Sequence, residues 1–509
     1  MLFYFKTTLD SCYKIPIIRF LLPYLCGILL CNYLIEWHKY VLIALSALTL
    51  IGLSITKIIR WQNLAILLFC LTLGLFSYKP ISSEPLLAKE TSTNNLQGQL
   101  IIWSLKKQNN QQLNFITQLD SIKYMVYLKK QQVNYLPGDT LMVEKFKIKL
   151  LSLTSESFSG YTEYLLSKGI KGQIFLKQKD VRLVKNGRGL FRTVYSFRQY
   201  LIQQIQAEKV FSPSQEGVFY SLLLGERSFL DKEIKEDFKE SGIIHVLAIS
   251  GLHVGILFAF IQGIFKALRI HNRYFKLIFV VILLLFYAIV AGLSPSVVRA
   301  GLMCCLIQFG LFIQEKNVIM NIVLSSALFL LLFKPLWIWD LGFLLSYFAV
   351  IFIVLVLENY KPLVQKISNP MLKKFVQLCM VNLAAFTGTF PILLSNFGVI
   401  YFGSILSSLV IIPLVTVLVM LGISTLIFTP IKIIFHFLLV LNKYLIQLLN
   451  QAATTFSEKI SFPFTLEITV LQSVILYLML FVVLNRNINL MNKLKTVAVF
   501  FTCILLSIF

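Results

Sequence analysis

The sequence has few charged residues and many long apolar runs. Of its 509 residues, 14% are charged and 57% are hydrophobic, whereas soluble domains contain about 25% charged residues. This composition argues against a soluble enzyme. A hydrocarbon core ~30 Å thick is crossed by about 20 apolar residues in a helix, and the chain contains many runs of this kind. The sequence therefore predicts a polytopic α-helical membrane protein.

The patterns that mark most catalytic and metal sites are also missing from the sequence. The five histidines form no HxH or HExxH pair, and the eight cysteines form no CxxC pair, so neither residue type has the spacing of a metal site. Because the cysteines lie mostly in apolar runs, we predict small buried side chains rather than disulfides. No glycine-rich phosphate loop and no GxSxG motif occurs. We therefore predict no catalytic residues, no metal, no cofactor and no ATP hydrolysis.

A polar segment divides the apolar sequence. Apolar runs at about 17–35, 40–57 and 62–78 predict transmembrane helices within 1–78, whereas residues 79–189 are rich in Gln, Asn and Lys. Alternating apolar and polar residues predict half-buried strands in this polar part, at Gln97–Trp103, Gln112–Leu119, Lys123–Leu128, Thr140–Lys149 and Gly172–Leu176. Pro137-Gly138-Asp139 predicts a turn, and Tyr161–Lys168 looks helical. Short strands of this number and spacing favour a small OB-like β-barrel.

The remaining chain divides into an amphipathic region and an apolar region. Residues 190–241 predict interfacial helices, because Phe219, Leu222 and Leu223 form an apolar stripe and residues 231–240 alternate in charge. Residues 242–509 predict a transmembrane domain. Its candidate spans are 243–265, 277–293, 296–313, 318–333, 336–357, 375–394, 398–428, 431–450, 466–485 and 494–509. The run 398–428 contains Pro413 and is interpreted as one broken or re-entrant unit.

The distribution of basic residues predicts the orientation in the membrane. The chain carries 47 Lys and Arg against 23 Asp and Glu, a net charge of +24. With a cytoplasmic N-terminus in the plasma (inner) membrane, the basic loops fall inside, as the positive-inside rule requires. Residues 79–189 then lie outside, yet 79–185 holds 16 basic and 8 acidic residues. This excess fits either a soluble lysine-rich domain or a basic groove for single-stranded nucleic acid.

The densest motif of the apolar region is Gly242-Ile-Ile-His-Val-Leu-Ala-Ile-Ser-Gly-Leu-His-Val-Gly255. On a helix, small residues form one stripe that predicts close helix packing, namely Ala248, Gly251, Gly255 and Ala259. Ser250 and His253 lie together on the roughly opposite face. Polar groups at membrane depth are costly, so this face is expected to meet either a cavity or a hydrogen-bonding neighbour.

A second motif is Gly292-Leu-Ser-Pro-Ser-Val-Val-Arg-Ala-Gly301. Ser294 and Pro295 predict a helix N-terminus, which places Arg299 just over one turn into an apolar helix. Both the helix dipole and desolvation disfavour a cation there, and a bound anion would relieve both costs. The alternatives are snorkelling of the arginine to the interface, or a salt bridge to Glu226 or Asp340.

Three stretches together resemble the competence domain of the ComEC DNA-channel family. They are Gly225-Glu-Arg-Ser, the motif ending at Gly255, and Ser294-Pro-Ser-x-x-Arg299. Supporting positions are Pro335, Gly342-Phe-Leu-Leu-Ser-Tyr347, Pro391, Phe397 and Pro413. The resemblance covers nearly the whole chain, because the family also carries an extracytoplasmic OB-like domain after its first helices. Many members end with a metallo-β-lactamase-like domain. Its motif does not precede Phe509, so either a short form or a truncated chain is expected, without that nuclease role.

The resemblance implies a channel that passes single-stranded DNA across the inner membrane during natural transformation. Its expected pore or DNA-contacting residues are Ser250, His253, Ser296, Arg299 and Arg227. Expected partners are single-stranded DNA, membrane lipids, a cytoplasmic helicase or translocase, an extracytoplasmic DNA receptor and a second copy of the chain. The alternative is a secondary transporter or polymer-handling membrane protein that uses His253 and Arg299 on another anionic substrate.

Overall fold

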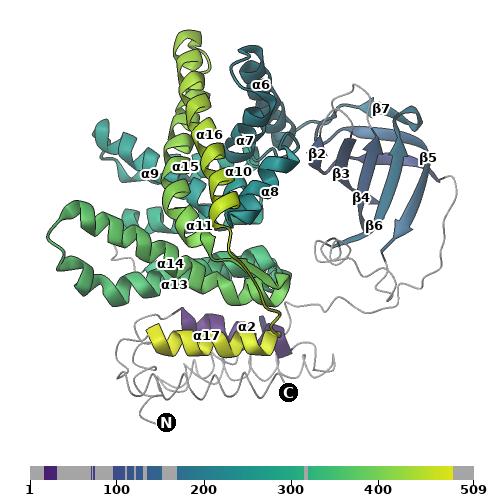
Figure 1. Ribbon diagram of the computed structural model, residues 1–509. Coiled ribbons are helices and arrows are strands. Elements are labelled where there is room, and N and C mark those ends of the chain that lie inside the picture. Colours follow the sequence, from purple (N-terminus) through teal and green to yellow (C-terminus); the bar gives the residue numbers. More distant parts are fainter. Residues whose placement is uncertain are drawn as a thin grey trace.

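The computed structural model describes residues 17–30, 70–71, 73–74, 96–108, 112–119, 122–129, 135–151, 165, 169–313 and 319–484. The predicted runs at 40–57 and 494–509, most of the run at 62–78 and the segment 161–168 apart from Leu165 lie outside these residues. The described chain is mostly helical and carries one β-rich domain, which stands to one side of the helices (Figure 1).

The β-rich domain consists of seven paired strands. They are β1 (Leu96–Ile101), β2 (Ser104–Gln108), β3 (Gln112–Leu119), β4 (Ile122–Lys129), β5 (Thr140–Leu150), β6 (Ile170–Lys177) and β7 (Val181–Lys185). The pairing order is β1-β5-β6-β4-β3-β2, and β7 pairs with β5. The strand pairs are antiparallel except β4 with β6. The five predicted strands are confirmed as β1, β3, β4, β5 and β6, whereas β2 and β7 were not predicted and closure into an OB-like barrel stays a prediction.

The predicted turn at Pro137-Gly138-Asp139 is confirmed, and it joins the β-rich domain to the helices. The Asp139 side chain is buried, accepts a hydrogen bond from the Gly187 backbone N–H at 2.9 Å and forms an ion pair with Arg192. Gly138 has a φ of +90°, and a Cβ added to Gly187 would lie 2.3 Å from the Gly138 carbonyl carbon. This close backbone approach sets where the chain leaves β7 for the first helix of the next region.

That region contains α6 (Leu190–Ala207), α7 (Pro213–Leu223) and α8 (Lys232–Glu240). Helix α6 is amphipathic, with exposed Phe191 and Tyr200 and an inner face that includes Leu201. Helix α8 buries only Phe238 among its residues.

The prediction of an interfacial helix is wrong for α7. All residues from Gly217 to Leu223 are buried, and the Ser221 hydroxyl among them is paired because it donates to the Val218 carbonyl at 2.8 Å. The backbone of α7 is in tight contact with its surroundings. A Cβ on Gly217 would lie 2.3 Å from the Phe229 carbonyl oxygen, and one on Gly422 would lie 2.3 Å from Leu223 Cδ1.

The chain is a multi-pass membrane protein by the length and composition of its helices. Among the described residues, six helices are long and apolar enough to cross a membrane. They are α10 (Arg273–Val290), α11 (Pro295–Ile313), α13 (Leu341–Gln365), α14 (Pro370–Phe397), α15 (Gly403–Ile427) and α16 (Lys432–Ile460). Shorter apolar helices are α2 (Ile18–Leu30), α9 (Gly251–Ala267), α12 (Ile319–Phe333) and α17 (Val470–Leu484).

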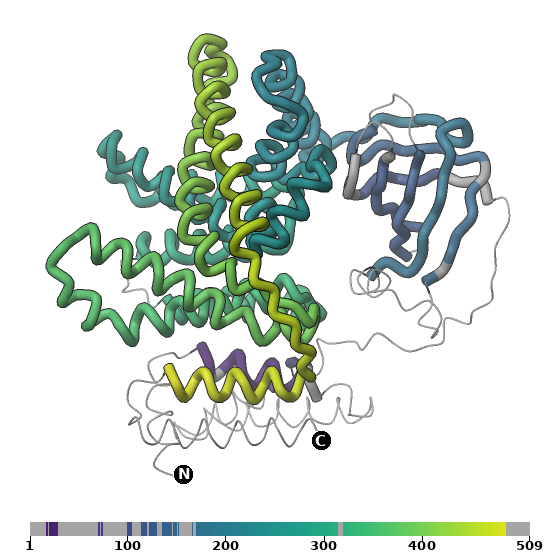
Figure 2. Tube along the Cα trace, viewed as in Figure 1, coloured from purple at the N-terminus to yellow at the C-terminus, as the bar shows by residue number. Residues whose placement is uncertain are grey.

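Two groups of helices meet at α11. One apolar core joins α6, α7, α9, α10 and α11 to α15 and α16, and a second joins α2, α12 and α13, with side chains of α11 packed against it. The α13–α14 hairpin crosses α15 and α16 in Figure 1, and α2 and α17 lie below it. The tube in Figure 2 follows the extended connection from α16 down to α17. On this connection β9 (Pro463–Thr465) pairs with β8 (Val399–Tyr401).

Three predicted spans differ from the structure. The span 336–357 begins with a 3₁₀ helix, Pro335–Trp339, and α13 starts only at Leu341. The span 243–265 is not one helix, because Ile244–Leu247 form a 3₁₀ turn, Ala248 is extended and α9 begins only at Gly251. The run 398–428 is a single unit, as interpreted, but α15 continues through Pro413 without a break. Proline is tolerated inside membrane helices because neighbouring groups satisfy the freed carbonyl.

The contacts of α7 predict that Gly217→Ala destabilises the folded protein. The added methyl group would overlap the Phe229 carbonyl oxygen, and overpacking of this kind costs about 1–3 kcal/mol. Gly255→Ala is the matched control, because no described atom lies within 4 Å of its Cβ position, so removing a helical glycine is expected to be neutral or slightly stabilising. Thermal unfolding of the detergent-solubilised chain measures both. Equal melting temperatures for the two variants would contradict the packing described for α7.

Candidate functional site

The three motif stretches named in the sequence lie together in the fold. Gly225 has a φ of +70°, and a Cβ placed on it would lie 3.0 Å from the Ala291 carbonyl oxygen and 3.2 Å from Ile249 Cδ1. A Cβ on Gly251 would lie 3.5 Å from the Cβ of Ala300. The loop after α7, the start of α9 and the start of α11 therefore form one neighbourhood.

At the start of α9, Ser250 and His253 cap the helix reciprocally. The Ser250 backbone N–H donates to His253 Nδ1 at 3.2 Å, and the Ser250 hydroxyl lies 3.0 Å from the same nitrogen. A backbone N–H can only donate, so Nδ1 accepts and a neutral imidazole carries its proton on Nε2. The His253 side chain is fully buried, and its Nε2 has no hydrogen-bond partner among the described residues. This arrangement leaves one buried N–H donor unpaired.

The small-residue stripe predicted for this helix is wrong at Ala248, which precedes α9 in an extended conformation. Gly251 contacts α11 through Ala300, whereas nothing described lies within 4 Å of the Gly255 Cβ position, and Ala259 is exposed. The stripe requires a continuous helix, and the chain is not α-helical immediately before Gly251.

Arg299 lies inside the protein at the predicted position near the start of α11. Its side chain is 1% exposed, and its Nη2 donates to Ser296 Oγ at 3.0 Å and to the Gly342 carbonyl oxygen at 2.8 Å. The guanidinium carbon lies 5.8 Å from the centre of the Phe343 ring. Arg299 Nε and Nη1 and the Ser294 hydroxyl are buried without partners among the described residues. The arginine thus connects α11 to the start of α13 with only one of its three nitrogens.

These contacts decide between the alternatives for Arg299. Snorkelling is excluded by its burial, and a salt bridge to Glu226 is wrong because that carboxylate pairs with Arg198 at 2.6 Å. Asp340 caps α13 by accepting from the Phe343 N–H at 2.9 Å, and it lies within electrostatic range of Arg299. The positive charge of Arg299 is therefore partly balanced at the start of α13.

The loop that follows α7 is held by Glu226. In addition to the Arg198 ion pair, Glu226 accepts hydrogen bonds from the Ser228 N–H at 3.1 Å and the Ser228 hydroxyl at 2.6 Å. Arg198 and Glu226 are nearly buried, with side-chain exposures of 5% and 14%. The side chain of Arg227, between these fixed groups, is exposed. Sequence inspection singled out Arg227 and missed Arg198, which belongs to α6 and carries no motif.

The predicted site residues lie at the first turns of α11, which contact α13 on one side and α9 on the other. Arg299 points toward α13, whereas the next residue, Ala300, faces Gly251 of α9. No described contact joins Arg299 to Ser250 or His253, so the structure brings these residues near one another without aligning them in a single row. Their unpaired groups among the described residues are the imidazole N–H, two guanidinium nitrogens with their hydrogens and a hydroxyl. Buried polar groups are normally paired, and this donor set suits an anion.

Aromatic and basic side chains also lie together on one face of the β-rich domain. The rings of Tyr127 on β4 and Phe175 on β6 stack with their centres 5.1 Å apart and their planes 13° from parallel, and Phe175 is 56% exposed. Lys147 is the register partner of Phe175 on β5. The sequence offers Tyr127 either as a stacking aromatic or as a core residue and does not single out Phe175, although Phe175 occupies the exposed phase of the alternation in β6. Among the described residues, no group of three His, Cys, Asp or Glu side chains could hold a metal ion.

Comparison with known proteins agrees with the motif stretches. A family model described as "Competence protein" matches residues 222–487, which is more than half of the chain. "ComE operon protein 3" of Bacillus subtilis is 30% identical over 229 residues, which are 45% of this chain and 28% of that protein. "Recombination protein 2" of Haemophilus influenzae is 27% identical over 260 residues, 48% of this chain and 31% of that protein.

An uncharacterised protein of Aquifex aeolicus is 29% identical over 233 residues, 45% of this chain and 52% of that protein. The chain thus matches about half or less of the length of each relative. No solved structure matches it. The family match covers the loop after α7, the starts of α9 and α11, and the helices up to α17, and the chain therefore belongs to the ComEC family of competence proteins.

Proposed function

We propose that this protein is an inner-membrane channel that passes single-stranded DNA during natural transformation. The observation that carries the proposal is the meeting of three motif stretches at a buried site whose unpaired groups are hydrogen-bond donors. The matching family model is described as "Competence protein" and one relative is named "Recombination protein 2", which agrees with DNA as the substrate. A passing phosphodiester offers anionic oxygens that match these donors.

Arg299 is the residue proposed to meet the phosphates. Its Nη2 is already used by Ser296 and the Gly342 carbonyl, so an arriving phosphate would take the Nε and Nη1 hydrogens without breaking these bonds. Guanidinium is delocalised and weakly hydrated, and it therefore tolerates burial better than an ammonium group. Asp340 near the same charge would weaken phosphate binding, which favours release over retention.

The β-rich domain is proposed to be an OB-like barrel that receives the strand. The two ends of the pairing order, β1 and β2, are parts of one segment separated only by Ile102 and Trp103. Because β1 pairs with β5 and β2 pairs with β3, a bend at these two residues supports closure. Exposed lysines flank the Tyr127–Phe175 stack on β4, β5 and β6, at Lys123, Lys129, Lys147, Lys149, Lys171 and Lys177. Aromatic rings beside cations suit single-stranded nucleic acid.

Translocation is proposed to depend on partners. No nucleotide-binding motif occurs in the sequence, and a negative membrane potential opposes inward movement of an anion. A cytoplasmic helicase or translocase would supply the work, and an extracytoplasmic receptor would deliver the DNA. We propose no enzymatic activity for this chain.

The proposed orientation has the N-terminus in the cytoplasm and the β-rich domain outside. A cysteine introduced at exposed Lys177 of β6 is then expected to react with a membrane-impermeant maleimide in intact spheroplasts. A cysteine at exposed Lys366, in the α13–α14 connection, is expected to react only after permeabilisation. The unmodified chain, with its native cysteines, gives the background. The reverse labelling pattern would show that the orientation is wrong.

The β-rich face predicts that Phe175→Ala weakens binding of single-stranded DNA. Stacking of a base on an aromatic ring contributes about 1–3 kcal/mol, so the affinity of the full chain for a fluorescent oligothymidine is expected to fall about tenfold or more. Leu183→Ala is the control, because Leu183 is also exposed but lies on β7 opposite the other end of β5. Fluorescence anisotropy at several salt concentrations measures both, with affinity falling as salt rises. Equal affinities for the two variants would remove this face from DNA binding.

The polar site predicts different effects for two Arg299 substitutions. Arg299→Gln retains an amide that can donate to the Gly342 carbonyl but loses the charge, and DNA uptake is expected to fall about 100-fold, as for loss of a buried charge contact. Arg299→Lys retains the charge and is expected to keep part of the uptake. Labelled-DNA uptake and membrane abundance are measured together.

His253→Gln serves as the companion variant. Glutamine at this position of a capping box can still accept from the Ser250 N–H, so membrane abundance is expected to stay normal while uptake falls with the loss of the imidazole N–H. If Arg299→Gln and Arg299→Lys lower abundance equally, Arg299 serves only to join α11 to α13. Normal uptake in both Arg299→Gln and His253→Gln would end the proposal for these residues.

A further inference from the structure

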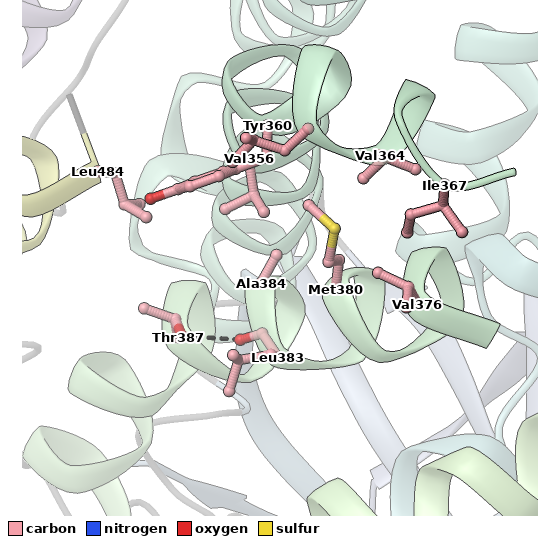
Figure 3. A pocket seen from close by; sticks show the side chains of 11 residues that line it. Val356, Tyr360, Val364, Ile367, Val376, Met380, Leu383, Ala384, Thr387 and Leu484 are labelled. Atoms are coloured by element: carbon pink, nitrogen blue, oxygen red, sulfur yellow. Dashed lines mark hydrogen bonds between the residues drawn. The ribbon is translucent and has the colours of Figure 1, made fainter. Parts of the chain in front are cut away.

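An apolar pocket of about 410 Å³ lies where α13 turns into α14 (Figure 3). Residues from the second half of α13, from its connection to α14, from the first two thirds of α14 and from the end of α17 line it. They are Val356, Tyr360, Leu363, Val364, Ile367, Val376, Met380, Leu383, Ala384, Thr387 and Leu484. The Asn359 side-chain amide donates to the Leu484 carbonyl at 3.2 Å, which holds the end of α17 against α13 at the border of the pocket.

The inner surface of the pocket carries two side-chain hydroxyl groups, those of Tyr360 and Thr387, and is otherwise apolar. Its threonine, Thr387, donates its hydroxyl to the Leu383 carbonyl at 2.7 Å within the same helix, as the dashed line in Figure 3 marks. Val364 and Ala384 are buried, whereas Leu363 and Leu383 are about half exposed. The pocket therefore has an apolar interior and an apolar rim that is open to its surroundings.

One end of the pocket is basic. The α14 residues that line it recur at positions 376, 380, 383 and 387, which is one helix face, and Lys373 continues this face by one turn toward the hairpin. Lys373 is half-buried, whereas Lys361, Lys366 and Lys374 are exposed. Segment 358–374 contains these four lysines and one carboxylate, Glu358. The N-terminus of α14 adds its positive helix dipole at the same end.

An occupant of this pocket must be apolar along most of its length and anionic at one end. Helices α13 and α14 are both long and apolar enough to cross a membrane, so the rim of the pocket is expected to face lipid acyl chains. We propose that an anionic phospholipid binds here, with one acyl chain between α13 and α14 and its phosphate at Lys373. DNA is charged along its whole backbone and does not suit the apolar interior. Basic pockets between membrane helices are a recurrent form of anionic headgroup recognition.

The proposal predicts a specific effect of two substitutions in the delipidated full chain. The chain in detergent is titrated with phosphatidylglycerol or phosphatidylcholine, and bound lipid is counted by native mass spectrometry. Phosphatidylglycerol is expected to bind more tightly. Lys373→Gln is expected to weaken phosphatidylglycerol binding about fivefold, the effect of one basic residue near an anionic lipid, and to leave phosphatidylcholine unchanged. Ala384→Leu fills the buried pocket wall and is expected to abolish specific binding of both.

Matched controls lie one residue away from each variant. Lys374→Gln removes an exposed lysine that lies off the pocket face, and Ala385→Leu makes the same enlargement at a position that does not line the pocket. Both are expected to bind phosphatidylglycerol as the unmodified chain does, with equal melting temperatures. These controls separate loss of the site from loss of folding.

Four results would overturn the proposal. The first is equal binding of the two lipids with no effect of Lys373→Gln, and the second is unchanged binding in Ala384→Leu. The third is competition between an oligothymidine and phosphatidylglycerol, together with a Lys373→Gln variant that binds the oligothymidine more weakly but the lipid as before. The lysines would then bind DNA. The fourth is lipid binding that appears only after deletion of residues 494–509, because the chain's own apolar run would then be the occupant.

Discussion

The burial of Arg299 is the constraint on which the centre of this structure depends. A cation inside apolar helices is unstable unless its N–H groups are paired and its charge is balanced. Here the Gly342 carbonyl and the Ser296 hydroxyl pair one nitrogen, and Asp340 supplies nearby negative charge. These contacts require the start of α13 to lie against the start of α11. The loop with Gly225 and the start of α9 then pack on the other sides of the same turns.

Around Arg299, ion pairs and hydrogen bonds hold some groups in place, whereas other buried donors have no partner among the described residues. The Arg198–Glu226 pair and the Ser228 hydrogen bonds hold the loop after α7, and breaking a buried pair of this kind costs about 3–5 kcal/mol. The reciprocal cap of Ser250 and His253 holds the start of α9. By contrast, His253 Nε2 and Arg299 Nε and Nη1 have no hydrogen-bond partners among the described residues. Fixed donors that lack acceptors favour an anion, which supports the proposal that a phosphate of the DNA meets Arg299.

Much of this arrangement could be predicted from the sequence, and the exceptions have physical causes. The strands of the β-rich domain and the start of α11 at Pro295 follow from local patterns, namely alternation and the Ser294-Pro295 cap. The break before Gly251 could not be predicted from hydropathy, because residues 243–265 are apolar on average despite His245, Ser250 and His253. The partner of Arg299 could not be predicted either, since a backbone carbonyl at Gly342 leaves no mark in the sequence. The burial of α7 could not be predicted either, because an apolar stripe of Phe219, Leu222 and Leu223 also fits an interfacial helix.

Helix α13 joins the two proposed sites. Its first turn holds the Gly342 carbonyl that Arg299 contacts, and its last turns line the apolar pocket beside the basic end of α14. A helix of 25 residues is about 37 Å long, which is close to the span of a bilayer. A lipid headgroup held at Lys373 would therefore fix the depth of α13 in the membrane. Because the same helix carries the acceptor for Arg299, that depth also determines where the cation of α11 lies along the path proposed for DNA.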